Sequence, residues 1–523
     1  MKNFKKCLLM VFITGCLVSC EKNLNRIRPN STTDATAFTS LQGYTQALAK
    51  VYGAFGTTGS SGPGSGDIAG IDAGTSDFLR LYWNAEELPT DEGLCVWNDP
   101  GVPDFHNISW TSSNVILLGL YDRSLYQITV ANQFINESTD ANLASRGITG
   151  NDATTVRYYR AEARFLRAYQ YWVLMDMFGN PPFVTENTPI GKVLPPQISR
   201  SNLFNYIESE LKAIDPLLVK PRANAYGRAD EAADWALLAR MYLNASVYTG
   251  KDRSTDAITY ASKVIGAGYT LMPVYANLFK ADNDTNNPEV IFPIEYDGVQ
   301  TQNYGGTTFI INSSLPTTIA AQYGMPSGGW AGNHSLQTLP QIFGDYSGAS
   351  DNRAMFYTTG NTENTTDETT FTKGFTVVKF SNLTSTGQLP PQAGGVMAST
   401  DFPLFRLGEM YLIYAEAVLR GGSGGTMAQA LTYFNALRTR AHAANVGSIA
   451  LSDIINERAK EMYWEATRRT DLIRFGMFTG GTYLWPFKGG VLNGTAIADF
   501  RALYPLPATD VTVNINLKQN PGY

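Results

Sequence analysis

Cysteine is scarce in this chain of 523 residues, and three of its four cysteines lie within the first 20 positions. Cys7 and Cys16 fall in a stretch with the features of a secretion signal, and Cys20 follows it directly. Only Cys95 is left after processing, so we expect no internal disulfide. An exported protein without disulfides depends on its hydrophobic core, and a chain of this length is long enough to bury one.

Charged residues are also sparse, at 16% of the chain, and neither sign forms a long run. The formal net charge of −6 falls to −9 if residues 1–19 are removed, because they contain three lysines and no acidic residue. Nucleic-acid binding needs a basic face, so this class of partner is excluded. After the signal, no apolar run is long enough to span a membrane.

Residues 1–19 predict a signal peptide. Basic residues are followed by an apolar run that ends at Leu17 and is too short to cross a bilayer. The sequence LVSC at 17–20 has the pattern of a lipobox, so we expect Cys20 to become the acylated first residue. The alternative is an ordinary secretory signal with an incidental cysteine. The polar residues 20–40 then form a flexible, lipid-anchored tether.

Aromatic residues are plentiful, at 12% of the chain with 28 Tyr and 8 Trp, and Gly, Asn and Thr are common as well. This combination is typical of a surface rich in loops. Such a surface offers flat apolar rings together with amide and hydroxyl hydrogen-bonding groups.

The clearest helix signal lies in residues 160–186. Beginning just before this stretch, apolar residues recur at steps of three or four, which places them on one helical face: Tyr158, Ala161, Phe165, Ala168, Trp172 and Met175. Gly179 can close the helix, and two prolines follow it. A helix with so wide an aromatic face has to pack against other helices, because helical propensity alone would not hold it.

Periodicity and capping residues predict further helices at 41–55, 114–137, 201–218 (with Ser201 as N-cap), 230–250, 252–269, 407–420, 427–443 and 452–475. Their short connections favour antiparallel pairs that loosely resemble tetratricopeptide (TPR) repeats, without a strict 34-residue register. We therefore predict a mainly α fold, with a single domain over 41–523 and a helical core at about 114–269 and 401–478. Loop-rich insertions are expected at about 56–113 and 270–400, with short strands such as Val290–Ile294 and Phe375–Phe380.

Five blocks of sequence, in the expected order, resemble the SusD/RagB family of nutrient-binding outer-membrane lipoproteins. They are residues 160–186, 226–245, 401–420, 457–478 and 504–523. The resemblance implies a TPR-like helical core and assigns most of these residues to the scaffold. We therefore interpret the charged residues near the last helices as structural ion pairs and not as an active cluster: Arg468, Arg469, Asp471 and Arg474.

Within the family, the similarity is greatest to the starch-binding member. It extends to segments where the wider family diverges: 84–105, 279–298, 303–309 and 483–498. That member holds maltooligosaccharides in an arc of three aromatic side chains, and the resemblance implies Trp97, Tyr304 and Trp330 for these positions. Its polar contacts match Arg80 and Asp72, and Asn98 matches a further amide contact.

Each of these assignments has a structural alternative. Trp97 and Trp330 lie among Gly, Asn and Pro and not on a helical stripe, which favours binding, but either side chain can equally belong to the core. Arg80 can bridge adjacent sugar hydroxyls with its planar fork, or it can form a salt bridge to Asp77 or Glu86.

The resemblance implies a cell-surface protein, lipid-anchored in the outer membrane and facing the exterior. It would capture α-1,4-glucan and pass it to a SusC-like TonB-dependent transporter. A family member tuned to another glycan or to a peptide, and a TPR-type scaffold that binds only protein, are the alternatives.

Catalysis is not expected. The three histidines, His106, His334 and His442, lack metal-ligand spacing, and the G-x-S-x-G match at residues 421–425 is a linker between helices. No cofactor is required by this interpretation. Asp282 and Asp284 lie in a cluster of oxygen ligands that is compatible with a structural calcium ion and equally with a solvated loop.

Overall fold

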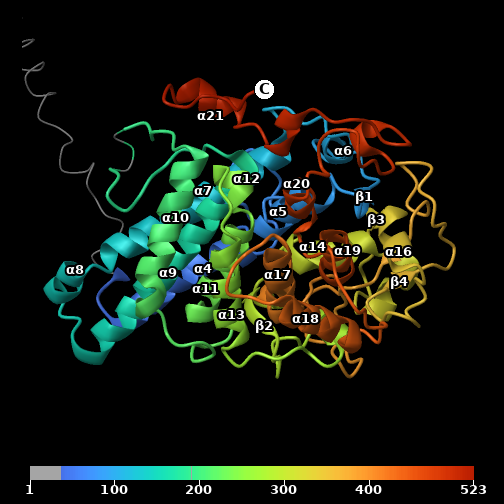
Figure 1. Cartoon of the computed structure of the whole chain (residues 1–523). Coiled ribbons are helices and arrows are strands. Elements are labelled where there is room, and N and C mark those ends of the chain that lie inside the picture. Colours follow the sequence, from blue (N-terminus) through green and yellow to red (C-terminus); the bar gives the residue numbers. More distant parts are fainter. Residues whose placement is uncertain (1–36, 190, 192) are drawn as a thin grey trace, which may run out of the picture.

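The computed structural model describes residues 37–189, 191 and 193–523 (Figure 1). The predicted signal peptide, the lipidation site Cys20 and most of the tether lie outside the described residues. Phe38, at the end of the stretch assigned to the tether, is only 5% exposed, and its ring lies 5.1 Å from that of Tyr44. Among the helices in the described part of the chain, none has the length and apolar character needed to cross a bilayer.

Long helices make up one half of the molecule (Figure 1), which confirms the mainly α prediction. The central helix α9 contacts α4, α7 and α10, and α13 lies between α11 and α17. The helices of this half are α4 (Leu41–Gly56), α7 (Val115–Glu137), α8 (Asp140–Ser145), α9 (Gly150–Phe178), α10 (Arg200–Ile214), the 3-10 turn η1 (Asp215–Leu217), α11 (Glu231–Leu243), α12 (Ala245–Thr249) and α13 (Ser254–Ile265).

Helix α9 ends as the sequence predicts, because Gly179 takes a φ of 72° directly before the two prolines. More than one face of this helix is buried. From Ala161 to Phe178 every residue except Arg164 is buried, whereas Tyr158 is 39% exposed. The helix therefore runs through the interior of the molecule, and only its first turns lie at the surface.

Several predicted boundaries are wrong. The N-cap of α10 is Ser199 and not Ser201, because the Ser199 hydroxyl accepts the backbone N–H of Asn202. The predicted helix 230–250 is broken at Asn244, and η1 tightens the end of the helix predicted over 201–218.

The carboxyl-terminal helices pack against this frame: α17 (Leu407–Leu419), α18 (Met427–Arg440), α19 (Leu451–Met462) and α20 (Arg468–Arg474). Residues 452–475 do not form one helix. Trp464 and Ala466 have positive φ angles of 65° and 56°, and they separate α19 from α20. The Trp464 ring is buried against Trp83 at 5.3 Å, so packing holds this unusual turn.

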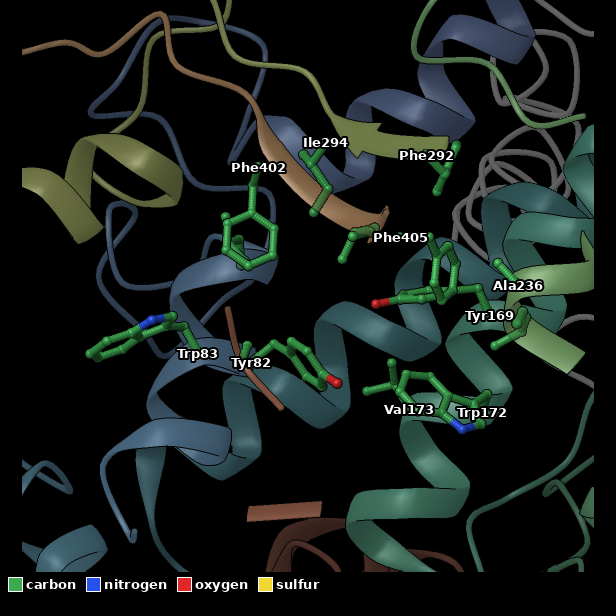
Figure 2. Packing of buried hydrophobic residues seen from close by; sticks show 14 of the residues in the cluster. Tyr82, Trp83, Tyr169, Trp172, Val173, Ala236, Phe292, Ile294, Phe402 and Phe405 are labelled. Carbon is green, nitrogen blue, oxygen red and sulfur yellow. The ribbon is translucent and has the colours of Figure 1, made fainter. Parts of the chain in front are cut away.

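The core extends from the helical half into both loop-rich regions (Figure 2). Tyr82 and Trp83 come from α5 (Phe78–Glu87), Tyr169 and Trp172 come from α9, and the strands contribute Phe292 and Phe405. Helix α5 lies in a stretch that the sequence analysis assigned to loops, and nine of its ten residues are buried. This correction matters for the site, because α5 carries Arg80.

The loop-rich half contains three antiparallel two-stranded sheets. They pair β1 (Gly93–Cys95) with β3 (Asn333–Ser335), β2 (Val290–Ile294) with β6 (Phe402–Arg406), and β4 (Phe356–Tyr357) with β5 (Thr376–Val377). The predicted strand Val290–Ile294 is confirmed, and the one at 375–380 is shorter than predicted. Short helices complete this half: α6 (Pro103–His106), η2 (Tyr275–Phe279), α14 (Gly306–Ser314), α15 (Thr317–Ala320), η3 (Ala321–Tyr323), α16 (Thr338–Phe343) and η4 (Lys488–Gly490). The last elements of the chain are η5 (Asp499–Ala502) and α21 (Ala508–Val513), and α21 lies over the helical half, where Asp510 accepts the hydroxyl of Tyr121 from α7.

Buried ion pairs join the two halves, and the charged residues near α20 belong to them. Arg468 pairs with Asp91 at 2.7 Å, and Arg474 pairs with Glu416 and Asp471, each at 2.7 Å. Arg469 donates to the backbone oxygen of Ala502. The predicted structural ion pairs are confirmed for Arg468, Asp471 and Arg474, whereas Arg469 is held by a backbone oxygen.

A second buried group, the central charge cluster, surrounds Glu461. Its carboxylate pairs with Arg406 at 2.6 Å, with Arg353 at 2.9 Å and with Arg440. Glu289, Lys379 and Glu465 are further members of the cluster. Every one of these side chains is at most 4% exposed, so each charge depends on its partners and not on water.

Candidate functional site

The pairing of β1 with β3 brings Trp97 and Trp330 to the same end of one small sheet. Cys95 lies opposite Asn333, and the next hydrogen bond runs from the Val96 N–H to the Gly332 oxygen at 2.9 Å. Trp97 follows this pair on one strand, and Trp330 precedes it on the other. Two tryptophans that are more than 200 positions apart in the sequence are thereby placed side by side.

Tyr304 reaches the same place from the loop before α14. The carboxamide of Asn303 donates to the Gly56 oxygen at 2.7 Å and accepts from the Gly305 N–H. The Gly306 N–H donates to the carboxylate of Asp77 at 2.8 Å. The loop is therefore tied on both sides of Tyr304, whose ring stays 42% exposed.

The three rings form one row, which we call the aromatic face. The ring of Trp330 lies 6.4 Å from that of Trp97 and 6.5 Å from that of Tyr304, centroid to centroid. Successive ring planes are turned by 43° and 49°, so the row is bent. Both indoles are half-buried, and the Trp97 N–H donates to the Trp330 oxygen at 3.4 Å.

Two glycines allow the backbone to approach these rings closely. A Cβ at Gly332 would lie 2.3 Å from the Trp97 indole, and one at Gly74 would lie 2.6 Å from the Cβ of Tyr304. Any larger residue at either position has to displace an aromatic side chain. Their role was not recognised from the sequence, because it depends on contacts between distant segments.

Arg80 lies on α5 beside the aromatic face. Its guanidinium stacks 4.5 Å from the centroid of the Phe309 ring, and its Nη1 donates to the Tyr304 oxygen at 3.4 Å. Its Nε is buried without a hydrogen-bond partner in the described chain, and burial lowers the pKa of the guanidinium. Phe309 is a further residue that the sequence analysis missed.

The salt bridges considered for Arg80 are absent from the described residues. The Asp77 carboxylate caps α5 by accepting the backbone N–H of Arg80 and also accepts the Gly306 N–H. Glu86 accepts hydrogen bonds from Thr470. The Arg80 guanidinium is therefore held by stacking and by one backbone oxygen, and it keeps donors for another partner.

Asp72 and Asn98 are exposed at the margin of the site. One carboxylate oxygen of Asp72 accepts the backbone N–H and the hydroxyl of Thr75, and its charge favours the protonated form of Arg80. The Asn98 carboxamide makes no hydrogen bond to the part of the chain that the structure describes. The structure therefore brings Trp97, Tyr304, Trp330, Arg80 and Asp72 together, with Asn98 next to Trp97 in the chain.

The loop that holds Asp282 and Asp284 is engaged in hydrogen bonds of its own. Asp282 accepts the backbone N–H and hydroxyl of Ser385, and Asp284 accepts the Thr285 hydroxyl. Within residues 37–189, 191 and 193–523, no group of three or more His, Cys, Asp or Glu side chains could hold a metal ion. Calcium binding at this loop stays a prediction, because hydroxyl, amide and backbone oxygens also coordinate that ion.

The histidines have local partners. His334 is buried in β3, where burial lowers its pKa to about 4. The ring of His106 lies 3.1 Å from the carboxylate of Glu368, and burial lowers its pKa as well. The position of each ring is explained by its contacts with neighbouring residues.

The helical frame and the aromatic face together define a scaffold that presents aromatic rings on anchored loops. A model of the SusD family matches residues 344–523. The starch-binding protein SusD of Bacteroides thetaiotaomicron is 37% identical to this chain, and the match covers 99% of this chain and 98% of that protein. The chain belongs to the SusD family.

Solved structures agree on the fold. Surface glycan-binding protein A from Bacteroides fluxus matches 92% of this chain and 99% of its own, with a TM-score of 0.71 and 21% identity. The corresponding protein from Bacteroides thetaiotaomicron, in complex with laminarihexaose, matches the same shares with a TM-score of 0.67 and 21% identity. At this level of identity these likenesses establish the architecture alone.

Proposed function

We propose that this protein is a surface glycan-binding lipoprotein that captures starch-derived maltooligosaccharides by stacking them on the aromatic face. The observation that carries the proposal is the bent row of Trp97, Trp330 and Tyr304, half-exposed and fixed by backbone pairing. The 37% identity to a starch-binding protein over nearly the full length supports the choice of glycan.

The bend of the row favours one shape of ligand. A sugar ring has an apolar C–H face that packs on an aromatic ring, while its hydroxyls remain at the rim. An α-1,4-glucan curves along its length, and the turns of 43° and 49° between successive rings suit glucose units that turn in the same way. A straight β-1,4 chain would stack on one ring and would not contact the next ring.

Polar groups beside the rings then select the hydroxyls. The guanidinium of Arg80 has unused donors in a fixed plane, which suits two adjacent hydroxyls of one glucose. The exposed carboxylate of Asp72 accepts hydrogen bonds on the same side, and Asn98 offers an amide next to Trp97. No bond is made or broken in this scheme, so ligand choice rests on shape, stacking and hydrogen bonds.

The same proposal includes the cellular setting. Cys20 carries the lipid that anchors the protein to the outer membrane with its body outside the cell, and the captured chain passes to a SusC-like TonB-dependent transporter. Membership of the SusD family supports this setting. A carrier has to release its cargo, so we expect weak affinity.

Isothermal titration calorimetry with maltoheptaose and laminarihexaose tests the choice of ligand. We expect saturable heat with maltoheptaose and at least about tenfold weaker binding of laminarihexaose, a difference of about 1.4 kcal/mol. Tighter binding of laminarihexaose would assign the protein to another glycan. A scaffold that binds only protein would give no heat with either sugar.

Gly332→Ala should weaken maltoheptaose binding by about tenfold, which corresponds to the loss of one aromatic stacking contact. The added methyl group overlaps the Trp97 indole at 2.3 Å and has to displace it. Gly447→Ala is a matched control, because nothing lies within 4 Å of its Cβ position. Equal affinity of both variants and the wild type would mean that the position of Trp97 does not matter for binding.

A further inference from the structure

A cavity of about 390 Å³ lies on the loop-rich half, away from the three rings. Part of its wall comes from residues 484–493, a segment that contributes nothing to the aromatic face. Side chains from the loop after β3 and from residues 364–366 form the remaining wall.

The polar groups of this cavity have no partners. The carboxamides of Gln337, Asn364 and Asn493 make no hydrogen bond to the described residues, and all three line the cavity. The Thr365 hydroxyl is unpartnered as well, although Thr365 is only 2% exposed. A buried hydroxyl without a partner destabilises the fold, so a ligand that bonds to it recovers free energy.

Three buried amides of the same half of the protein behave differently. The carboxamides of Asn303 and Asn312 each bond to backbone groups of distant segments, and that of Asn382 does the same. Those amides hold loops in place. The amides around the cavity hold nothing in the described chain, so structural support does not explain them.

The apolar part of the wall is exposed. Leu484 and Leu492 are each 44% exposed, and Trp485, which also lines the cavity, is buried. All nine residues of the lining are uncharged. A charged ligand would lose its hydration without a countercharge, so the lining favours a neutral ligand that has hydroxyls on one side and C–H groups on another.

We propose that this cavity is a second glycan subsite, which binds a neutral sugar unit through its amides, the Thr365 hydroxyl and the two leucines. The identity of that sugar as glucose in an α-glucan rests on the proposed function. Gln337 lies seven residues after Trp330 along a chain that includes β3, so their Cα atoms are at most about 25 Å apart. One long glucan chain, or two separate chains, can therefore contact both places on the same half of the molecule.

Methyl NMR of the leucine-labelled protein, titrated with maltoheptaose, tests the subsite. We expect the methyl signals of Leu484 and Leu492 to shift and saturate, while Leu217, a 48% exposed leucine on the helical half, stays unchanged as a control. The shifts should persist in Trp97→Ala/Trp330→Ala. They should require about tenfold more sugar in Asn364→Ala/Asn493→Ala, which removes two exposed hydrogen-bonding side chains.

The inference is overturned if the Leu484 and Leu492 signals do not move, or if they move no more than that of Leu217. It is also overturned if the shifts vanish in the double tryptophan variant, since they would then report the aromatic face, or if the double asparagine variant leaves the titration unchanged. A different result would contradict the proposed function. In that case Trp97→Ala/Trp330→Ala binds maltoheptaose as tightly as the wild type, whatever the leucine signals do.

Discussion

Glu461→Gln should lower the free energy of unfolding by about 3–5 kcal/mol, the range found when one partner of a buried ion pair is removed. Gln has nearly the shape of Glu, so the change removes charge and little else. Arg353, Arg406 and Arg440 would stay buried with one negative charge fewer among them. Urea denaturation followed by circular dichroism measures the loss.

An exposed pair provides the comparison. Asp140 bonds to Arg157 and Arg160 at the surface, where its side chain is 64% exposed, so Asp140→Asn should cost less than about 1 kcal/mol. Equal and small losses in the two variants would show that the central charge cluster contributes no more than a surface contact.

The central charge cluster also predicts that the protein loses stability at acidic pH. Burial alone would raise the pKa of Glu461, but Arg440, Arg406 and Arg353 outweigh it and hold the pKa well below the usual value of 4.5. The stabilisation from this carboxylate is therefore complete above pH 4.5 and is lost as the pH falls below it. The free energy of unfolding should fall more steeply on acidification in the wild type than in Glu461→Gln, because the variant has no carboxylate at this position to protonate.

Much of the helical frame could be predicted from the sequence, because its signals are local. The end of α9 follows from Gly179 and two prolines, and α7 follows from its apolar period. Helix α5 has an apolar period in its sequence, but it is only ten residues long and lies in a stretch dense in Trp, Asp, Asn and Pro, so it was missed. Its polar side is also buried, and two of its residues, Glu86 and Glu87, are buried carboxylates. The break between α19 and α20 depends on Trp464 at positive φ, a conformation that only packing selects.

The candidate site could be assigned residue by residue from the resemblance, but its geometry could not. Nothing local in the sequence indicates that Trp97 and Trp330 share one end of a sheet, because β1 and β3 pair across more than 200 positions. Phe309 beneath Arg80, and Gly332 against Trp97, depend on such long-range contacts as well. These residues emerge only when the fold is known.

The aromatic face is the centre of this account, and Trp97→Ala/Trp330→Ala should weaken maltoheptaose binding by at least about 100-fold. Each ring lost removes roughly 0.5–1.5 kcal/mol of stacking and, in addition, the burial of the apolar area that it covers. A total of about 1.4 kcal/mol for each ring gives this factor. The effect is large because Trp330 neighbours both other rings, so its removal interrupts the row.

Calorimetry of this double variant, beside Tyr158→Ala as an exposed aromatic control on α9, is the most direct measurement. Both indoles are half-buried, so circular dichroism should first establish that the variant is folded. The prediction is that Tyr158→Ala binds maltoheptaose like the wild type, whereas the folded double variant loses the heat of binding at the aromatic face and keeps at most the weaker heat of the second subsite. A folded double variant with wild-type affinity would contradict it.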